Sequence, residues 1–413
     1  MMRPLRQVQG EILQRVPALD EVTVDPKESI GLALAAPVAA PEDVPAFANS
    51  AMDGYAVQAT SVAAVPSDLE VVDEAAAGSA AKGAVAEGTA IKIMTGAPLP
   101  DGADSVVRVE ATEAAAGALV RILESVATGE NVRPAGGDLR SGSHVFDAGV
   151  RIGPAHASVL ASIGAEPLVR RRPVVAIMAT GDELVSHRTP ALERGQIRDS
   201  NTTLMRTMLE SLGAEVIDYE IVGDDPDLFE AALDKAASSA DVVVTSGGVS
   251  MGDYDVVKAL LQGQGVDFWQ VAMQPGKPLA FGTVADKPFF GLPGNPVSVF
   301  VSFEQFVRPA LLHMMGAHLL FRDRIGGVFD ETVHTAEEKE VFVRVTSDRD
   351  GEGVVHAAPS GGQSSNVLSA LAVADSLAVV PVGTATVEFG DAVELEMIKW
   401  PEARSAAEVL DGR

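Results

Sequence analysis

The chain has 413 residues, of which 47% are apolar, 22% are charged and none is cysteine. Without cysteine, thiolate catalysis, cysteine-ligated zinc, iron–sulfur clusters and disulfides are excluded. The 31 Lys+Arg against 58 Asp+Glu leave a net charge of −27, which excludes a chain-wide surface for nucleic acid.

The length predicts roughly two to four domains. The first residues, MMRPLRQVQGEILQRV, contain no apolar core of a signal peptide, and no run of about 18 apolar residues occurs. We therefore expect a cytoplasmic protein that neither spans a membrane nor binds nucleic acid. The seven histidines include no HExxH-like pair, so any metal is expected to be a hard cation such as Mg²⁺ on carboxylates.

Helical patterns at about 8–16 and 154–164 bracket the first β-rich part of the chain. Residues 46–139 contain short β-like runs separated by Gly and Pro, which predict a β-rich domain. We expect residues 1–45 and 140–172 to pair as one discontinuous helical and linking domain.

Residues 173–322 alternate β-like runs with amphipathic segments. The segment 201–213 places its Leu and Met side chains on one helical face and ends at Gly213, a favourable C′ residue. Asp225 and Pro226 predict the N-cap and first residue of another helix. The predicted strands are 173–179, 215–222, 241–245, 279–284 and 289–292. This alternation predicts an α/β domain with a mostly parallel sheet and helices on both faces.

The end of the chain returns to β-like patterns. A last helix of the α/β domain begins near Pro296, and Pro309 is expected to kink or end it. Residues 323–400 contain runs such as VFVRV and LAVVPV, and predict a C-terminal β-barrel-like domain. The polar tail 401–413 is expected to fray.

Each predicted strand of the α/β domain is followed by a polar or Gly-rich loop. In an open parallel sheet, ligands bind outside the carboxyl ends of the strands, so we expect the loops to line one crevice. The loops are 180–184, 222–225, 246–255, 274–278 and 292–298.

The chemistry of these loops indicates an anionic ligand. Ser246, Gly247 and Gly248 follow a strand and can present backbone N–H groups, while Lys277 adds a fixed positive charge. The carboxylates outnumber that charge, so a phosphate requires a divalent cation between them, and we predict Mg²⁺. These carboxylates are Asp182, Glu183, Asp224, Asp253 and Asp255. The sequence contains neither a P-loop nor a dinucleotide-binding fingerprint.

Simpler explanations exist for several of these residues. Asp225 is better explained as an N-cap than as a ligand, and Asp182 and Glu183 could equally cap a helix. Turn chemistry accounts for the Gly and Pro residues of the loops. The segment 248–252 matches GxSxG, but Ser250 lies beyond the end of its strand, so we reject a serine-hydrolase elbow.

Six motifs, taken together, resemble one known family. They are NSAMDGYA (49–56), IMTGAPLP (93–100), NVRPAGGD (131–138), TSGGVSMGDYD (245–255), PGKP (275–278) and LPGNPVS (292–298). In order and spacing, from about residue 5 to 400, the chain resembles the MoeA family of molybdopterin molybdenumtransferases, which includes the C-terminal part of gephyrin.

The resemblance implies an elongated homodimer of four-part chains. It also implies a reaction in which molybdate and adenylylated molybdopterin give the molybdenum cofactor, with Mg²⁺ required and AMP released. The α/β domain would be the molybdopterin-binding domain, facing the β-rich parts of the other subunit across a cleft. Transient partners would be a molybdopterin adenylyltransferase and the proteins that mature molybdoenzymes.

The resemblance also assigns residues. The catalytic set is Asp53, Asp138, Glu183, Asp224, Asp255 and Lys277, and the metal set within it is Asp255, Glu183 and Asp224. The substrate-binding set is Ser246, Gly247, Gly248, Ser250, Pro293, Asn295, Pro296, Arg344 and Ser365. Some members carry a lysine where this chain has Gln274, which removes one cation from the expected anion site.

Two other functions remain open from the sequence. A molybdopterin adenylyltransferase would use the α/β domain alone, and would need neither the β-rich parts nor the AMDGYA motif. A gephyrin-like scaffold would bind partner peptides in a cleft without catalysis, but no exposed aromatic groove can be identified in a chain with 5% aromatic residues.

Overall fold

The computed structural model describes residues 2–249 and 256–399. These residues form two compact units, and each is described by itself. The first unit comprises 1–22, 31–35 and 169–413, and the second comprises 23–30 and 36–168.

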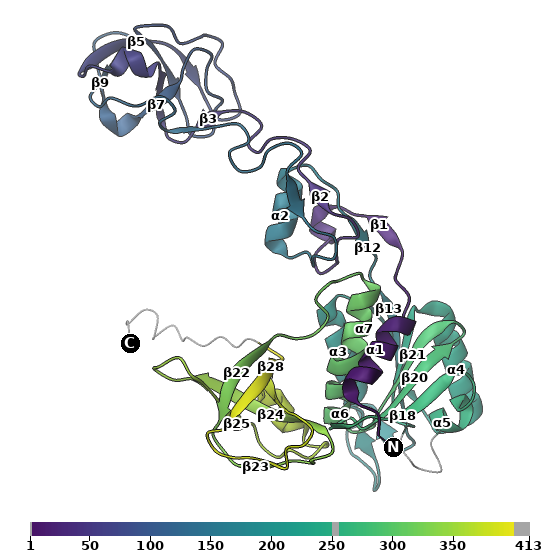
Figure 1. Ribbon diagram of the computed structural model, residues 1–413. Coiled ribbons are helices and arrows are strands. Elements are labelled where there is room, and N and C mark those ends of the chain that lie inside the picture. Colours follow the sequence, from purple (N-terminus) through teal and green to yellow (C-terminus); the bar gives the residue numbers. More distant parts are fainter. Residues whose placement is uncertain (1, 250–255, 400–413) are drawn as a thin grey trace. The chain divides into compact units, whose positions relative to one another are not determined.

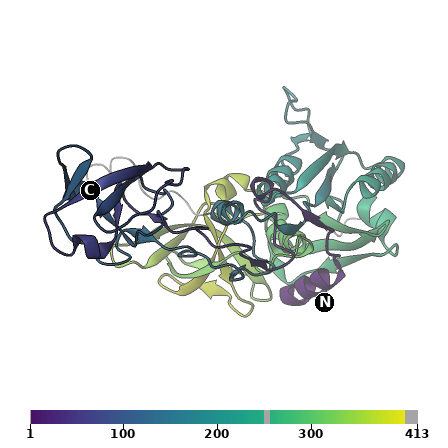
Figure 2. The same ribbon diagram turned by 90° about the horizontal axis from the view of Figure 1, so that it is seen from above.

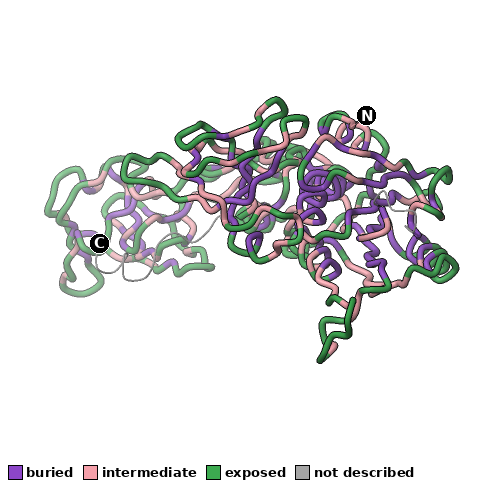
Figure 3. The backbone as a smooth tube through the Cα atoms, turned by 90° about the horizontal axis from the view of Figure 1, so that it is seen from below, coloured by how far each residue is buried: buried purple, intermediate pink, exposed green. Residues whose placement is uncertain are grey.

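A six-stranded sheet with the order β16-β13-β17-β21-β20-β18 forms the centre of the first unit (Figure 1). Its strands are β13 (Val174–Thr180), β16 (Glu215–Val222), β17 (Val242–Ser246), β18 (Val266–Gln270), β20 (Pro278–Val284) and β21 (Lys287–Leu292). The first four strands in this order are parallel, as predicted. Strands β13, β17 and β21 are buried along nearly their whole length, because the sheet is covered on both faces, whereas the described residues of the edge strand β16 are half-buried or exposed. Buried segments are purple in Figure 3.

Helices cover both faces of this sheet (Figure 1), and Figure 2 shows them from above. They are α3 (Asn201–Leu212) and α6 (Pro296–Ser302) on one face, and α4 (Pro226–Ser239) and α5 (Val256–Leu261) on the other. Two predicted helix boundaries are confirmed. Gly213 ends α3 with a φ of 94°, and the Asp225 carboxylate accepts N–H bonds from Asp227 and Leu228 at the start of α4.

Residues 279–284 do not form a parallel strand, which corrects the prediction. Strand β20 pairs antiparallel with β21 and with β18, a strand that the sequence did not indicate. The β20–β21 hairpin turns at Ala285 and Asp286, whose φ angles of 46° and 62° are left-handed. The loop 274–278 therefore precedes its strand instead of following it.

Pro309 does not end the last helix of the α/β domain. Helix α6 continues through the π-helical turn η4 (Phe303–Val307) into α7 (Arg308–Met314), where Pro309 is the second residue. A proline leaves the carbonyl four residues earlier without its usual donor. The Gln9 side chain supplies that donor, with its Nε2 3.3 Å from the Gln305 carbonyl oxygen.

Helix α1 (Leu5–Arg15) packs against α7 and buries Leu5, Val8 and Ile12. We predicted that residues 1–45 pair with 140–172 as one domain. Helix α1, at the start of that range, instead packs against the α/β domain. Within the second unit, helix α2 (Pro154–Ser162) packs against η1 (Pro26–Glu28).

The C-terminal part of the first unit is a closed β-barrel. Its five strands pair in the cyclic order β24-β25-β22-β28-β26, because β26 also pairs with β24. They are β22 (Arg324–Phe329), β24 (Glu340–Arg349), β25 (Val355–Pro359), β26 (Ser376–Val380) and β28 (Ala392–Met397). Helix α8 (Leu368–Val373) and the short pair β23 (Val333–His334) and β27 (Thr386–Val387) complete the domain.

A mixed six-stranded sheet with the order β7-β4-β6-β5-β9-β8 forms most of the second unit. Its strands are β4 (Gly54–Val57), β5 (Ser67–Ala75), β6 (Thr89–Ile93), β7 (Ser105–Arg108), β8 (Thr112–Ala114) and β9 (Leu119–Ile122), with short helices η2 (Ala59–Val62) and η3 (Val109–Ala111). The remaining pairs are β1 (Glu21–Thr23) with β12 (Leu168–Arg170), β2 (Val38–Ala39) with β11 (His144–Phe146), and β3 (Asn49–Ser50) with β10 (Val132–Arg133). None of the helices formed by residues 2–249 and 256–399 combines the length and apolar content needed to cross a bilayer.

Candidate active site

A cavity of about 1060 Å³, called the crevice below, opens at the carboxyl ends of the parallel strands in the first unit. Residues from each of the five predicted loops line the crevice, so the predicted convergence is confirmed. The barrel closes one side of it with Lys339 and with residues 363–366. A short parallel pair, β14 (Leu184–Val185) with β15 (Ile197–Arg198), borders it as well.

The glycines after β17 allow close packing at the floor of the crevice. Gly247 has a φ of 96°, and a Cβ there would lie 2.6 Å from the Thr180 carbonyl oxygen. The Gly247 N–H donates to the Leu292 carbonyl oxygen at 3.0 Å, which corrects the expectation that this amide holds an anion. The N–H of Gly248 makes no such bond with a described residue, so it remains a possible donor to a ligand.

Several buried polar side chains at the floor lack a partner. Three such groups make no hydrogen bond with a described residue: the hydroxyls of Thr180 and Ser246, and the Asn201 Oδ1. All three residues line the crevice. An unsatisfied buried polar group costs roughly 1–3 kcal/mol. The three atoms are themselves buried, so the unmet hydrogen bonds mark a polar floor of the crevice.

Three cations line the crevice without a close carboxylate partner that fully neutralises them. Lys277 is exposed, and its ammonium makes no hydrogen bond or ion pair with any described residue. The Arg198 guanidinium donates only to the Thr189 and Pro190 carbonyl oxygens, at 2.7–3.3 Å. The Lys339 ammonium lies 3.4 Å from Gln274 Oε1 and 3.5 Å from the Glu338 carboxylate. This arrangement suits an anionic ligand.

Two predicted carboxylates, Glu183 and Asp224, are exposed in the same crevice. The Glu183 carboxylate folds over Gly181, where a Cβ would lie only 2.5 Å from it. Asp182 and Asp224 hold their two loops together, because each carboxylate accepts the other residue's N–H, at 3.0 and 3.3 Å. Asp182 therefore ties the loops together, while Glu183 and Asp224 keep free oxygens.

The donor chemistry of these carboxylates fits the Mg²⁺ ion that the resemblance implies. Mg²⁺ prefers hard oxygen ligands, and commonly takes one or two carboxylates together with substrate phosphates. No group of three or more His, Asp or Glu side chains that could hold a metal occurs within the described residues. Asp255, the third predicted ligand, and Ser250 lie outside the described residues, as does Asp253.

The loop Pro293–Pro296 joins the α/β domain to the barrel. Asn295 Nδ2 donates to Ser365 Oγ at 3.0 Å, and the Val297 N–H donates to the Ser365 carbonyl oxygen at 3.1 Å. Asn295 and Ser365 line the crevice, as do Pro293 and Pro296, whereas Val297 is buried beneath it. Ser365 thus fixes the start of α6 from the barrel side.

Arg344 does not line the crevice. It is fully buried, and its guanidinium donates to the Gly362 and Ser364 carbonyl oxygens at 2.6 and 3.2 Å. Burial lowers the pKa of this guanidinium. Arg344 therefore positions the loop that carries Ser365 from behind.

Asp53 lies in the second unit, beside the IMTGAPLP motif. Its Oδ1 accepts hydrogen bonds from the Thr95 N–H at 2.7 Å and the Thr95 hydroxyl at 2.8 Å. These bonds, the backbone one first, lower the pKa of the exposed Asp53 carboxyl. Its Oδ2 has no partner among the described residues and can contact a ligand.

Three distant motifs meet around this carboxylate. Ser50 exchanges backbone hydrogen bonds with Gly96 and Ala97, and Ala51 donates to the Asn131 carbonyl oxygen. The motifs NSAMDGYA, IMTGAPLP and NVRPAGGD therefore build one surface of the second unit. Asp138, at the end of the third motif, is exposed, and its side chain has no partner among the described residues.

Sequence reasoning missed part of the crevice. The structure adds Arg198, Asp199, Asn201, Lys339 and Gln363 to its lining. Asp199 accepts the N–H groups of Asn201 and Thr202 and so caps α3. The position of Asp199 just before a predicted helix could have indicated this capping role. The residues next to Lys339 and Gln363 in the sequence did not indicate that these two line a ligand site.

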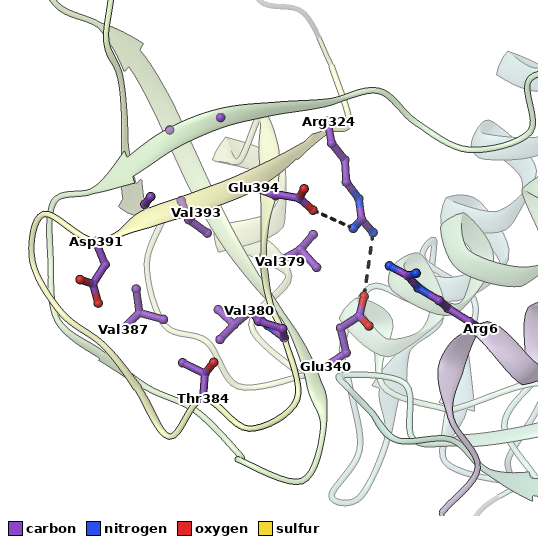
Figure 4. A pocket seen from close by; sticks show the side chains of 14 residues that line it. Arg6, Arg324, Glu340, Val379, Val380, Thr384, Val387, Asp391, Val393 and Glu394 are labelled. Atoms are coloured by element: carbon purple, nitrogen blue, oxygen red, sulfur yellow. Dashed lines mark hydrogen bonds and ion pairs between the residues drawn. The ribbon is translucent and has the colours of Figure 1, made fainter.

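A second cavity, of about 610 Å³, lies on the barrel and contains none of the sequence-predicted residues (Figure 4). Its charged side consists of Arg324, with ion pairs of 3.2 Å to Glu394 and 3.9 Å to Glu340, and of Arg6 (Figure 4). Arg324 is paired with acidic neighbours in this cavity, whereas the Arg6 guanidinium makes no hydrogen bond or ion pair with a described residue.

The fold and the crevice define a class of protein: a multidomain α/β protein with a cation-lined crevice at the carboxyl edge of its sheet, to which a β-barrel contributes residues. Family models match in three parts: MoeA N-terminal region (domain I and II) over 3–164, probable molybdopterin binding domain over 176–313, and MoeA C-terminal region (domain IV) over 327–398.

Relatives match over nearly the whole chain. Molybdopterin molybdenumtransferase 2 of Mycobacterium tuberculosis is 37% identical, covering 95% of this chain and 99% of the relative. The Haemophilus influenzae molybdopterin molybdenumtransferase is 33% identical, covering 96% and 98%. A crystal structure of the molybdopterin biosynthesis MoeA protein of Pyrococcus horikoshii superposes with a TM-score of 0.80 at 29% identity, covering 97% and 100%. The chain belongs to the molybdopterin molybdenumtransferase family, and is thus a transferase of molybdenum cofactor biosynthesis.

Proposed function

We propose that this chain inserts molybdate into adenylylated molybdopterin, with Mg²⁺-dependent release of AMP. The observation that carries the proposal is the crevice, where Lys277 lacks a partner among the described residues and buried hydroxyls of Thr180 and Ser246 are unsatisfied. Molybdate and a phosphoanhydride-linked nucleotide are both anions, and both offer oxygen atoms to such donors. The names of the relatives support molybdopterin and molybdenum as reactants, whereas the adenylyl group and its release as AMP are part of our proposal.

The residues of the crevice take separate roles in this proposal. Lys277 neutralises oxygens of the phosphoanhydride, and a fixed charge in a partly dry site stabilises the leaving phosphate more than water does. Ser246 and the Gly248 N–H donate to the same group or to molybdate. Asn295, held by Ser365, shapes the wall against the pterin end of the substrate.

Mg²⁺ would be held by Glu183, Asp224 and Asp255 together with substrate oxygens. When bound, the ion supplies positive charge between these carboxylates and the phosphates, which would otherwise repel each other. Glu183 and Asp224 also orient it, because their loops are tied together through the N–H bonds of Asp182 and Asp224.

The second unit contributes exposed carboxylates. We propose that Asp53, with one oxygen anchored and one free, positions water or molybdate, and that Asp138 assists from the connector. In this proposal the chain is a cytoplasmic homodimer, whose second unit completes the crevice of the partner. A molybdopterin adenylyltransferase would deliver the substrate, and maturation proteins of molybdoenzymes would accept the product.

The test is AMP release from adenylylated molybdopterin at micromolar molybdate, with and without Mg²⁺. We expect release that requires both, and that is lost in Asp255→Ala but retained in Lys235→Gln, an exposed lysine outside the crevice. Formation of adenylylated molybdopterin from ATP would instead identify an adenylyltransferase. Pterin-independent peptide binding without any AMP release would indicate a scaffold.

A further inference from the structure

The barrel places one lysine at the crevice through its backbone pairing. Strand β19 (Met273–Gln274) pairs in parallel with the start of β24, in the register Met273 to Glu340. The Glu340 N–H also donates to the Ala272 carbonyl oxygen at 3.0 Å. Lys339 precedes this pairing directly, so the register fixes its backbone beside the loop that carries Lys277.

The Lys339 side chain is held toward the crevice. It is only 18% exposed, it lines the cavity, and its ammonium lies 3.4 Å from Gln274 Oε1. A neutral amide oxygen orients the ammonium without neutralising it. The positive charge next to Gln274 therefore comes from the barrel.

Glu338 is the carboxylate nearest to this charge. It lies 3.5 Å from the Lys339 ammonium, and its own side chain is 60% exposed. Its pKa is lowered, first by a backbone hydrogen bond and then by the charges of Lys339 and Lys277. Lys277 and Lys339 both line the crevice, and the β19–β24 pairing holds the backbone of Lys339 beside the loop 274–278, so the two ammonium groups belong to one lining.

We propose that Lys339 and Lys277 form a two-cation clamp for a tetrahedral oxyanion, and that Glu338 is the internal counter-ion that this oxyanion displaces. The inference rests on the proposed function for the identity of its ligand, which is either the nucleotide phosphate or molybdate. An exposed carboxylate at 3.5 Å binds weakly and leaves easily, whereas an oxyanion shared by two ammonium groups gains charge-assisted bonds from both. The clamp also joins the barrel to the α/β domain through the ligand.

The test is calorimetric titration of the full chain with AMP in one arm and sodium molybdate in the other. Lys339→Gln should raise the Kd of at least one anion about tenfold, the size of a lost charge-assisted bond. Glu338→Gln should lower the same Kd about two- to fivefold, because a surface ion pair no longer competes. Lys235→Gln, an exposed lysine outside the crevice, should change neither.

The two substitutions are expected to change the Kd in opposite directions, which distinguishes contact with the ligand from a purely structural role. The arm that changes identifies the ligand group, and a Kd unchanged by Lys339→Gln in both arms overturns the clamp. If Lys339→Gln fails to fold, then Glu338→Gln decides alone, and an unchanged or weaker affinity overturns the inference. AMP binding that responds to both variants, without AMP release by the wild type, would support the clamp while contradicting the proposed function.

Discussion

The two ends of the six-stranded sheet in the first unit treat charge in opposite ways. At the amino end, Asp241 precedes β17 and accepts two bonds of 2.6 Å from the Arg171 guanidinium and one of 2.9 Å from the Val174 N–H. At the carboxyl end, the Lys277 ammonium makes no hydrogen bond or ion pair with a described residue. Charges that are satisfied within the protein stabilise it, and charges left unsatisfied are available to a ligand.

This contrast gives the sheet a stabilising edge and a binding edge. Burial raises the pKa of Asp241, but the Arg171 and Val174 donors outweigh that effect, so the pKa is lowered overall. The bonds connect the beginnings of β13 and β17, two neighbouring parallel strands. Substitutions at the two edges should therefore separate activity from stability.

The largest effect is expected at the binding edge. Lys277→Gln removes the charge and keeps a polar side chain only one atom shorter, so it should lower kcat/KM for AMP release about 100-fold. Its Tm should stay within about 2 °C of the wild type, since the substitution removes no side-chain hydrogen bond or close ion pair among the described residues. Steady-state kinetics and calorimetry measure both, with Lys235→Gln as the matched control. A large fall in Tm would show that Lys277 is structural.

The converse change at the stabilising edge is Asp241→Asn. Removing the Asp241 charge leaves Arg171 with only the exposed Asp20, at 3.4 Å, as a carboxylate partner among the described residues, and should cost about 2 kcal/mol, a value between those of exposed and buried pairs. For a domain of this size, that corresponds to a fall in Tm of about 4–8 °C. The value of kcat/KM at 25 °C should stay unchanged. Loss of activity in a folded Asp241→Asn protein would contradict the division between the edges.

The same pair predicts a pH dependence. The native pKa of Asp241 is below its ordinary value of 3.8, so the unfolded chain binds this proton more readily. The stability from the pair is complete above the ordinary pKa and is lost as the pH falls through the native pKa. Urea unfolding of wild type and Asp241→Asn should therefore differ most near neutral pH and converge in acid. A difference that stays constant down to about pH 2 would exclude this linkage.

The sequence predicted the binding edge better than it predicted the sheet. The parallel core follows from its Val-rich runs, and Gly213 and Asp225 act as expected at the ends of helices. The hairpin of β20 with β21 was missed because it turns at Ala285 and Asp286, both with positive φ, where Asn and Gly are the usual signals.

The predicted convergence of the loops nevertheless holds. The loop 274–278 was assigned to the carboxyl end of a parallel strand, but it precedes an antiparallel one. The beginning of an antiparallel strand lies at the same edge as the carboxyl ends of its parallel neighbours, so the loop still reaches the crevice. Lys339 could not be predicted, because its place depends on the long-range register of β19 with β24.

Asp53 in the second unit is like both edges of the sheet, because one of its carboxylate oxygens is satisfied within the protein and the other has no partner among the described residues. Thr95 donates to the first oxygen only. Thr95→Val removes the hydroxyl bond but keeps the backbone bond, so the pKa of Asp53 should rise toward its ordinary value. If ionised Asp53 takes part in the reaction, kcat/KM should fall about fivefold, and the acid limb of its pH profile should move upward by less than about one unit. Thr112→Val, which removes only a bond to the Val109 carbonyl oxygen, is the matched control. An identical loss in both variants, with no movement of the acid limb, would mean that Thr95 supports the fold and leaves the Asp53 carboxylate unaffected.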